Sequence, residues 1–147
     1  MRGRRRQQMS HMKSPSWREI EHTADWALEV WGKSQAELFR NAALGVASLL
    51  GGRPLGTQTT SRHFRLNAPD RETLLVDWLS ELLFWLEEQE LVLDDVQIER
   101  VEETSFLGEA TGMKGADLGR HIKGVTYNEL AIRSTDQGLK TTIVFDV

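Results

Sequence analysis

The sequence predicts a single domain of the α+β class, in which two main helices pack against a mostly antiparallel sheet. The chain has 147 residues, an ordinary size for one domain. Apolar residues recur at helical spacing in two segments, and most of the remainder alternates in strand-length runs. The late strands are separated by connections of hairpin length, which favours antiparallel pairing with the helices packed on the sheet.

Residues 25–31 form the first predicted strand, because apolar and polar side chains alternate along them. One face carries Trp26, Leu28 and Val30, and the other carries Asp25, Ala27, Glu29 and Trp31. The first helix follows at Ser34, where Ser34 and Glu37 have the spacing of a capping box, each side chain accepting from the other's backbone amide. This helix ends at Gly51-Gly52.

The second helix begins at Asp70, which follows Pro69 and is the predicted cap, and its apolar face fades near residues 87–90. Residues 60–67 form a less regular strand before it. Residues 96–103 and 105–113 are predicted to pair as a hairpin, and the run from Gly112 to Gly115 to form a turn.

Residues 121–133 and 139–146 are predicted to pair as a second hairpin. It is closed by residues 134–138, with Gly138 suited to a positive φ. The apolar phase slips by one residue between Tyr127 and Leu130, which indicates a bulge.

The composition excludes several classes of site. With no cysteine, the chain has no disulfide, thiolate nucleophile, zinc-thiolate site or iron–sulfur cluster. A metal would have to bind oxygen ligands, which favours Mg²⁺ or Ca²⁺. No phosphate-binding loop, dinucleotide fingerprint, zinc-protease motif or nucleophile elbow is present. No apolar run approaches the ~20 residues that span a bilayer, so we expect a cytoplasmic protein without a membrane partner.

The net charge of −4 combines a basic start with an acidic body. Residues 1–13 carry five basic side chains and no acid, which leaves 13 basic and 22 acidic residues, or −9, for residues 14–147. We interpret residues 1–13 as a disordered vector-derived leader or mis-assigned upstream start, and residues 14–147 as the domain. The acidic body disfavours strong direct binding to nucleic acid. It suits docking on a basic protein surface, although simple solubility is an equal explanation.

Acidic residues gather at two places that an antiparallel sheet would bring together. The first is the segment from Glu19 to Asp25, and the second is the chain end Phe145-Asp146-Val147. The carboxylates of Asp25, Asp146 and the chain end at Val147 would repel one another unless a hard cation joined them. The alternative is a frayed acidic terminus. Asp77 and Glu81 on the second helix, and likewise His63 and His121, fit ordinary surface roles better than chemistry.

Five motifs then occur in one order along residues 17–147. They are Glu21-His22-Thr23-Ala24-Asp25, Gly32-Lys33-Ser34 leading to Asn41-Ala42-Ala43, the run from Leu75 to Leu83, Lys123-Gly124-Val125-Thr126-Tyr127, and Val144-Phe145-Asp146-Val147. In this order they resemble the archease family. The resemblance implies an α+β fold and metal-binding positions at Asp25, Asp146 and Val147.

The resemblance also implies a function. Members of this family are cofactors of RtcB-type RNA ligases, which seal tRNA halves or repair RNA, and they promote guanylylation of the ligase histidine and multiple turnover. We therefore expect a non-catalytic accessory protein that uses a divalent metal, with His22 orienting Asp25 and Lys123 steadying a carboxylate or touching nucleotide phosphate. A plain surface role for Lys123 is an equal alternative. The rival functions are a general chaperone or modulator of RNA-modifying enzymes, a stand-alone metal-dependent enzyme, and a nucleic-acid-binding module.

Overall fold

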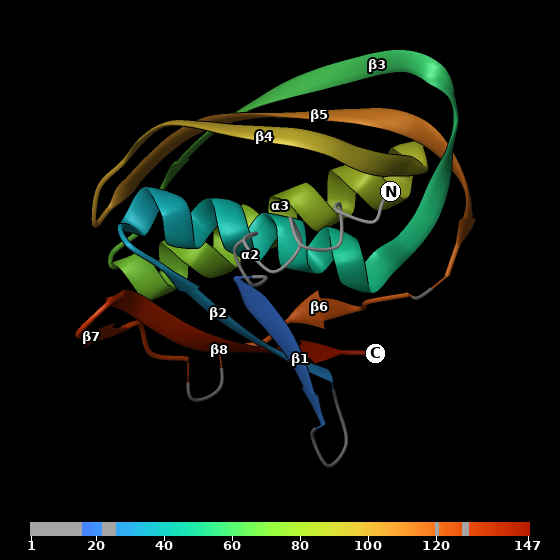
Figure 1. Cartoon of the computed structure of the whole chain (residues 1–147). Helices are drawn as coiled ribbons and strands as arrows, with labels where there is room; N and C mark the ends of the chain where they lie inside the picture. Colours follow the sequence, from blue (N-terminus) through green and yellow to red (C-terminus); the bar gives the residue numbers. More distant parts are fainter. Residues whose placement is uncertain (1–15, 22–25, 120, 128–129) are drawn as a thin grey trace, which may run out of the picture.

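The computed structural model describes residues 16–21, 26–119, 121–127 and 130–147. Two helices lie between two antiparallel sheets (Figure 1). The predicted α+β class, the antiparallel pairing and the two main helices are therefore confirmed. The strands, however, divide into two sheets, one on each side of the helices, because the buried side chains of each helix span too wide an arc for one sheet to cover.

The first sheet has the strand order β1-β2-β8-β6, with β7 also paired to β8. Its strands are β1 (Trp17–Glu21), β2 (Trp26–Gly32), β6 (Gly124–Val125), β7 (Arg133–Thr135) and β8 (Gly138–Asp146). The alternation predicted for β2 is confirmed for its described residues, since Leu28 and Val30 enter the core. The strand β1, which pairs antiparallel with β2, was not predicted.

The second sheet has the order β3-β5-β4, formed by β3 (Gly51–Asn67), β4 (Leu91–Val101) and β5 (Ser105–Leu118). The predicted β4–β5 hairpin is confirmed, and its strands are longer than expected. The turn predicted between Gly112 and Gly115 is wrong, because this run lies inside the central strand β5. Glycine suits it there, since a Cβ on Gly115 would lie 2.4 Å from the Val92 side chain on β4.

The helices α2 (Gln35–Leu50) and α3 (Arg71–Gln89) begin and end close to the predicted residues. The Ser34 hydroxyl accepts a hydrogen bond from the Glu37 backbone amide at 3.2 Å. The Glu37 carboxylate, however, accepts from the backbone amide of Lys33 at 2.7 Å and not from that of Ser34, so only half of the predicted capping box forms. The Asp70 side chain caps α3 through the Thr73 amide at 2.7 Å. Gly51, at φ +70°, ends α2. Within the described ranges, neither helix has the length and apolar character needed to cross a membrane.

One continuous core joins the two sheets through the helices. On the side of the second sheet, Trp78 packs against Phe64 and Phe106 with ring centroids 5.1 and 4.5 Å apart, and its indole N–H donates to the Phe39 carbonyl at 3.0 Å. On the side of the first sheet, Leu28, Ile143 and Phe145 are fully buried in the same cluster.

The second predicted hairpin is confirmed at both ends of its first arm, because β6 and β7 each pair antiparallel with β8, and it is interrupted between them. The closing turn of this hairpin is confirmed, since β7 and β8 pair on either side of it and Gly138 has φ +128°. Of residues 121–132, however, only Gly124 and Val125 are in a strand among those described, and residues 128–129 of the predicted bulge lie outside the described ranges.

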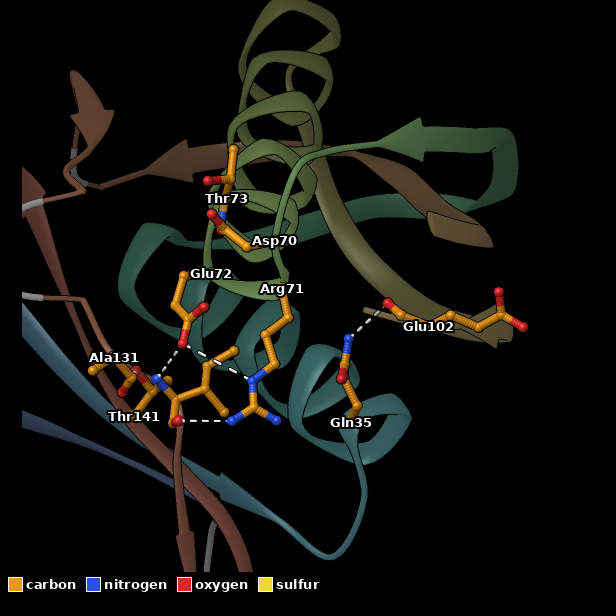
Figure 2. Close-up of polar contacts among 9 residues, drawn as sticks. Gln35, Asp70, Arg71, Glu72, Thr73, Glu102, Ala131 and Thr141 are labelled. Carbon is orange, nitrogen blue, oxygen red and sulfur yellow. Dashed lines mark hydrogen bonds and ion pairs between the residues drawn. The ribbon is translucent and has the colours of Figure 1, made fainter. Parts of the chain in front are cut away.

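This connecting segment, residues 121–132, follows α3 in the opposite direction. Its described residues contact Glu87 at one end, through the Ile122 amide at 3.5 Å, and Glu72 at the other, through the Ile132 amide at 3.1 Å. Arg71 also donates to the Ile132 carbonyl at 3.0 Å, and Figure 2 shows Arg71 and Glu72 converging there. Helix side chains thus satisfy backbone groups that a longer β-ladder would have used.

Candidate functional site

The end of β8 lies beside the beginning of β2, as the antiparallel hypothesis requires. Phe145 pairs with Trp26, the first described residue of β2, and Asp146 pairs with Gly124 of β6 on the other side of β8. In Figure 1 the C-terminus emerges next to β6 at this corner of the first sheet. Asp25 directly precedes Trp26 in the sequence but lies outside the described residues, as does His22.

Neighbouring backbone fixes the position of Asp146, while its side chain is exposed. The Asp146 carbonyl accepts the Lys123 amide at 2.7 Å, and the preceding residue, Phe145, is completely buried. Val147 follows with 41% of its surface exposed. The structure therefore brings Asp146, Val147 and Lys123 together at one exposed corner, with the Lys123 side chain also exposed.

The donors at this corner fit a hard cation in their chemistry. Carboxylate and carbonyl oxygens are the ligands that Mg²⁺ and Ca²⁺ prefer. Among the residues that the structure describes, no three His, Asp or Glu side chains are grouped closely enough to hold a metal ion. Of the three predicted ligand positions, Asp146 and Val147 lie at this corner, and Asp25 lies outside the described residues.

The acid pair on α3 has separate partners. Glu81 forms an exposed ion pair with Arg62 at 3.1 Å, in keeping with its surface interpretation. Asp77 accepts the Tyr127 hydroxyl at 3.2 Å. Burial, together with the charge of Asp77 and this hydrogen bond, raises the pKa of Tyr127, so the phenol stays protonated and continues to donate. Asp77 therefore helps to attach the connecting segment to α3.

The two described histidines are surface residues, as predicted. His63 Nδ1 lies 4.0 Å from a Glu109 carboxylate oxygen, and His121 Nδ1 lies 3.5 Å from Glu87 Oε2. Both imidazoles are well exposed, with 66% and 74% of their side-chain surfaces accessible. Neither faces Asp146 in the contacts described, so neither adds a ligand to the candidate site.

A hollow of about 570 Å³ on the outer face of the first sheet combines Trp31 with two cations, Arg18 and Lys140. Both cations contact the same carboxylate: Glu29 lies 2.6 Å from Arg18 and 3.1 Å from Lys140. Because Glu29 already joins the three strands in this way, we interpret the charges there as stabilising the sheet.

The attachment of the connecting segment to Arg71 and Glu72 was likewise not predicted. In the sequence these are two ordinary charged residues at a helix start, and nothing in their spacing distinguishes them from solvated side chains. Their role depends on which residues the fold brings beside them.

Comparisons with known proteins give a consistent result. The profile of the Archease protein family matches residues 17–147. An archease of Methanosarcina barkeri is 36% identical over 136 residues, covering 87% of this chain and 93% of its own. An archease of Archaeoglobus fulgidus is 30% identical over 143 residues, covering 89% of this chain and 98% of its own.

Two solved structures share the fold. The crystal structure of a Thermotoga maritima protein, described as an archease and possible chaperone, has a TM-score of 0.63 and 26% identity, covering 93% of this chain and 98% of its own. The solution structure of a Methanobacterium thermoautotrophicum protein also has a TM-score of 0.63, with 23% identity, and covers 91% of this chain and all of its own.

Proposed function

This chain belongs to the archease family, and we propose that it activates an RtcB-type RNA ligase by promoting guanylylation of the ligase and its multiple turnover. The process served would be tRNA splicing or RNA repair. The observation that carries the proposal is the family match over residues 17–147, which includes both strand ends at the candidate site. In this role the chain is an accessory protein, and GTP or phosphoester turnover without the ligase would contradict that.

The metal site of the proposal consists of Asp25, Asp146 and Val147. A bound Mg²⁺ or Ca²⁺ would supply positive charge close to the nucleotide of the ligase. Asp146 is well suited as a ligand because its backbone is held by Lys123 and β6 while its side chain is exposed. His22 would orient the Asp25 carboxylate without itself binding the metal, and Lys123 would steady a carboxylate or contact a phosphate.

The overall charge supports docking on a basic surface. Residues 14–147 carry 13 basic and 22 acidic side chains, a net charge of −9. A ligase that binds RNA needs a basic site. The acidic domain would be attracted to the opening of that site and would not compete for the RNA itself.

The first test is multiple-turnover RNA ligation by the RtcB-type ligase of the same source, with this protein at substoichiometric amounts. We expect much more than one product per ligase. Failure to raise the yield, with a ligase shown to complete a single turnover, would contradict the proposal.

The second test removes one proposed ligand. Asp146→Ala should reduce the stimulated rate at limiting metal by at least about tenfold, since even losing a residue that only supports a metal ligand commonly costs 10–100-fold. Asp136→Ala is the matched control, because Asp136 is equally an exposed aspartate of the first sheet, in the β7–β8 turn. An Asp146→Ala protein that is folded and still activates fully would exclude this site.

The chaperone function is the second candidate, and it is favoured by the description of the Thermotoga maritima relative as a possible chaperone. A general chaperone would suppress aggregation of unrelated proteins and would not need Asp146. Equal protection by the wild type and Asp146→Ala, without ligase activation by either, would support it.

A further inference from the structure

Three exposed large hydrophobic side chains belong to neighbouring elements of the fold. Five are exposed among the described residues, and three of them come from α3, the connecting segment and the end of β8. These are Phe84, Tyr127 and Val147, with 61%, 57% and 41% of their surfaces accessible. An aromatic side chain held on a rigid helix and left in water is a typical anchor of a protein interface.

Acidic residues share the exposed face of α3 with Phe84. Glu81 and Glu88 are three residues before and four residues after Phe84, so they lie on the same side of the helix. Asp77, two turns before Phe84, continues the face to the Tyr127 hydroxyl. Arg62, which pairs with Glu81, is the one cation among the described residues that forms an ion pair with these three acids.

The connecting segment contacts both this face of α3 and the candidate site at the end of β8. Residues 121 and 122 contact Glu87, and Tyr127 contacts Asp77 ten residues earlier on α3. In the sequence, Phe84 lies between these two contact points on α3, and residues 123–125 lie between them on the connecting segment. The same residues flank the end of β8, where the Lys123 amide donates to the Asp146 carbonyl and Gly124 pairs with Asp146.

We propose that this face, formed by Asp77, Glu81, Phe84, Glu88 and Tyr127, docks on a partner protein whose surface has an apolar recess surrounded by Lys and Arg. Phe84 fills the recess, and the three acids meet the basic rim. The proposal rests on the proposed function, in which the ligase is that partner, and it separates two tasks: the α3 face supplies affinity and the Asp146 corner acts on the ligase.

The test measures ligase activation as a function of the concentration of this protein. Phe84→Ala should raise the half-activating concentration by at least about tenfold, as expected of an interface anchor, and leave the rate at saturation unchanged. Leu55→Ala is the matched control, because Leu55 is 59% exposed but lies on β3 in the second sheet. Both side chains are exposed, so both variants should keep the wild-type thermal midpoint.

A charge reversal tests the rim. Glu88→Lys should also raise the half-activating concentration and make it less sensitive to salt, whereas Glu99→Lys, an equally exposed change on β4, should behave as wild type. Asp146→Ala should show the opposite pattern, with a lower rate at saturation and an unchanged half-activating concentration.

Three outcomes would overturn the inference. If the wild type activates the ligase and Phe84→Ala and Glu88→Lys match their controls, the α3 face is not the docking surface, although the proposed function stands. If Phe84→Ala instead dissociates a dimer of this chain alone, the face serves self-association. If the wild type neither binds nor activates the ligase, the proposed function fails, and the ligase is excluded as the partner.

Discussion

At the residue scale, Gly45 shows how close contact decides the identity of a side chain. It lies in the middle of α2, where alanine would ordinarily favour the helix by about 1 kcal/mol. A Cβ at this position, however, would lie 2.5 Å from the Leu28 side chain and 3.0 Å from the Trp17 ring. The glycine allows α2 to pack directly on β1 and β2.

We predict that Gly45→Ala destabilises the protein by about 1–3 kcal/mol, because the overpacking outweighs the helix propensity. Ser48→Ala, an exposed change one turn later in the same helix, should be neutral or slightly stabilising. Urea denaturation compares the two. A Gly45→Ala protein more stable than wild type would show that Leu28 and Trp17 can move apart without cost.

At the scale of the secondary-structure elements, Glu29 connects three strands of the first sheet. Its carboxylate on β2 contacts Arg18 on β1 and Lys140 on β8, and its side chain is 15% exposed. Burial raises the pKa of Glu29, but the hydrogen bonds and charges of Lys140 and Arg18 outweigh burial and hold the pKa below the usual value for glutamate.

A lowered pKa makes this contribution dependent on pH. The ionised Glu29 stabilises the fold above the pKa of an unfolded glutamate, and the stabilisation is lost as the pH falls through the lowered folded pKa. We predict that Glu29→Gln costs about 1 kcal/mol at neutral pH, since both cations are partly exposed and screened by solvent. The difference from wild type should shrink in acid.

Urea unfolding of the wild type and Glu29→Gln, from neutral pH into acid, measures the effect. Glu103→Gln in the exposed β4–β5 turn is the control. A difference between Glu29→Gln and wild type that stayed constant into acid would mean that the carboxylate charge is not what joins the three strands.

The connecting segment makes a second point at this scale. Its apolar residues are spaced as in a strand, yet most of it lies along α3, because Glu72 and Glu87 accept its backbone amides and Arg71 donates to its carbonyl. Figure 2 shows the same region tied to β8, where Thr141 donates to the Ala131 carbonyl at 2.9 Å. Local periodicity could not reveal the attachment to α3, since Arg71, Glu72 and Glu87 are 35 to 61 residues away from their partners in the sequence.

At the scale of the whole molecule, the helices couple the two sheets. The buried cluster runs from Ile143 in the first sheet through α2 and α3 to Leu91 in the second, so neither sheet has a complete core of its own. Small domains with one core generally unfold in a single step.

We predict that Ile143→Val, in the first sheet, costs about 0.5–1.5 kcal/mol, and that Leu91→Ala, in the second, costs about 2–5 kcal/mol. Each should lower the unfolding midpoints measured by far-UV circular dichroism and by tryptophan fluorescence together. Two separate midpoints in either variant would mean that the sheets unfold independently.

Features that depend on neighbouring residues could be predicted from the amino-acid sequence alone. Helix starts at Ser34 and Asp70, the stop at Gly51, the β4–β5 hairpin and the turn at Gly138 were predicted because capping, positive φ and alternation are local properties. The antiparallel order also placed the end of β8 beside the start of β2. The family motifs then identified Asp146 as the residue of interest, and the metal set remains a prediction.

Features that depend on distant residues were set by the three-dimensional fold. It divided the strands into two sheets, because the buried arc of each helix is too wide for one sheet to cover. It placed Gly112 and Gly115 inside a strand, since the neighbouring side chains of β4 require the space. It also aligned the exposed face of α3 with the corner at Asp146, through a segment whose backbone is held by the side chains of α3.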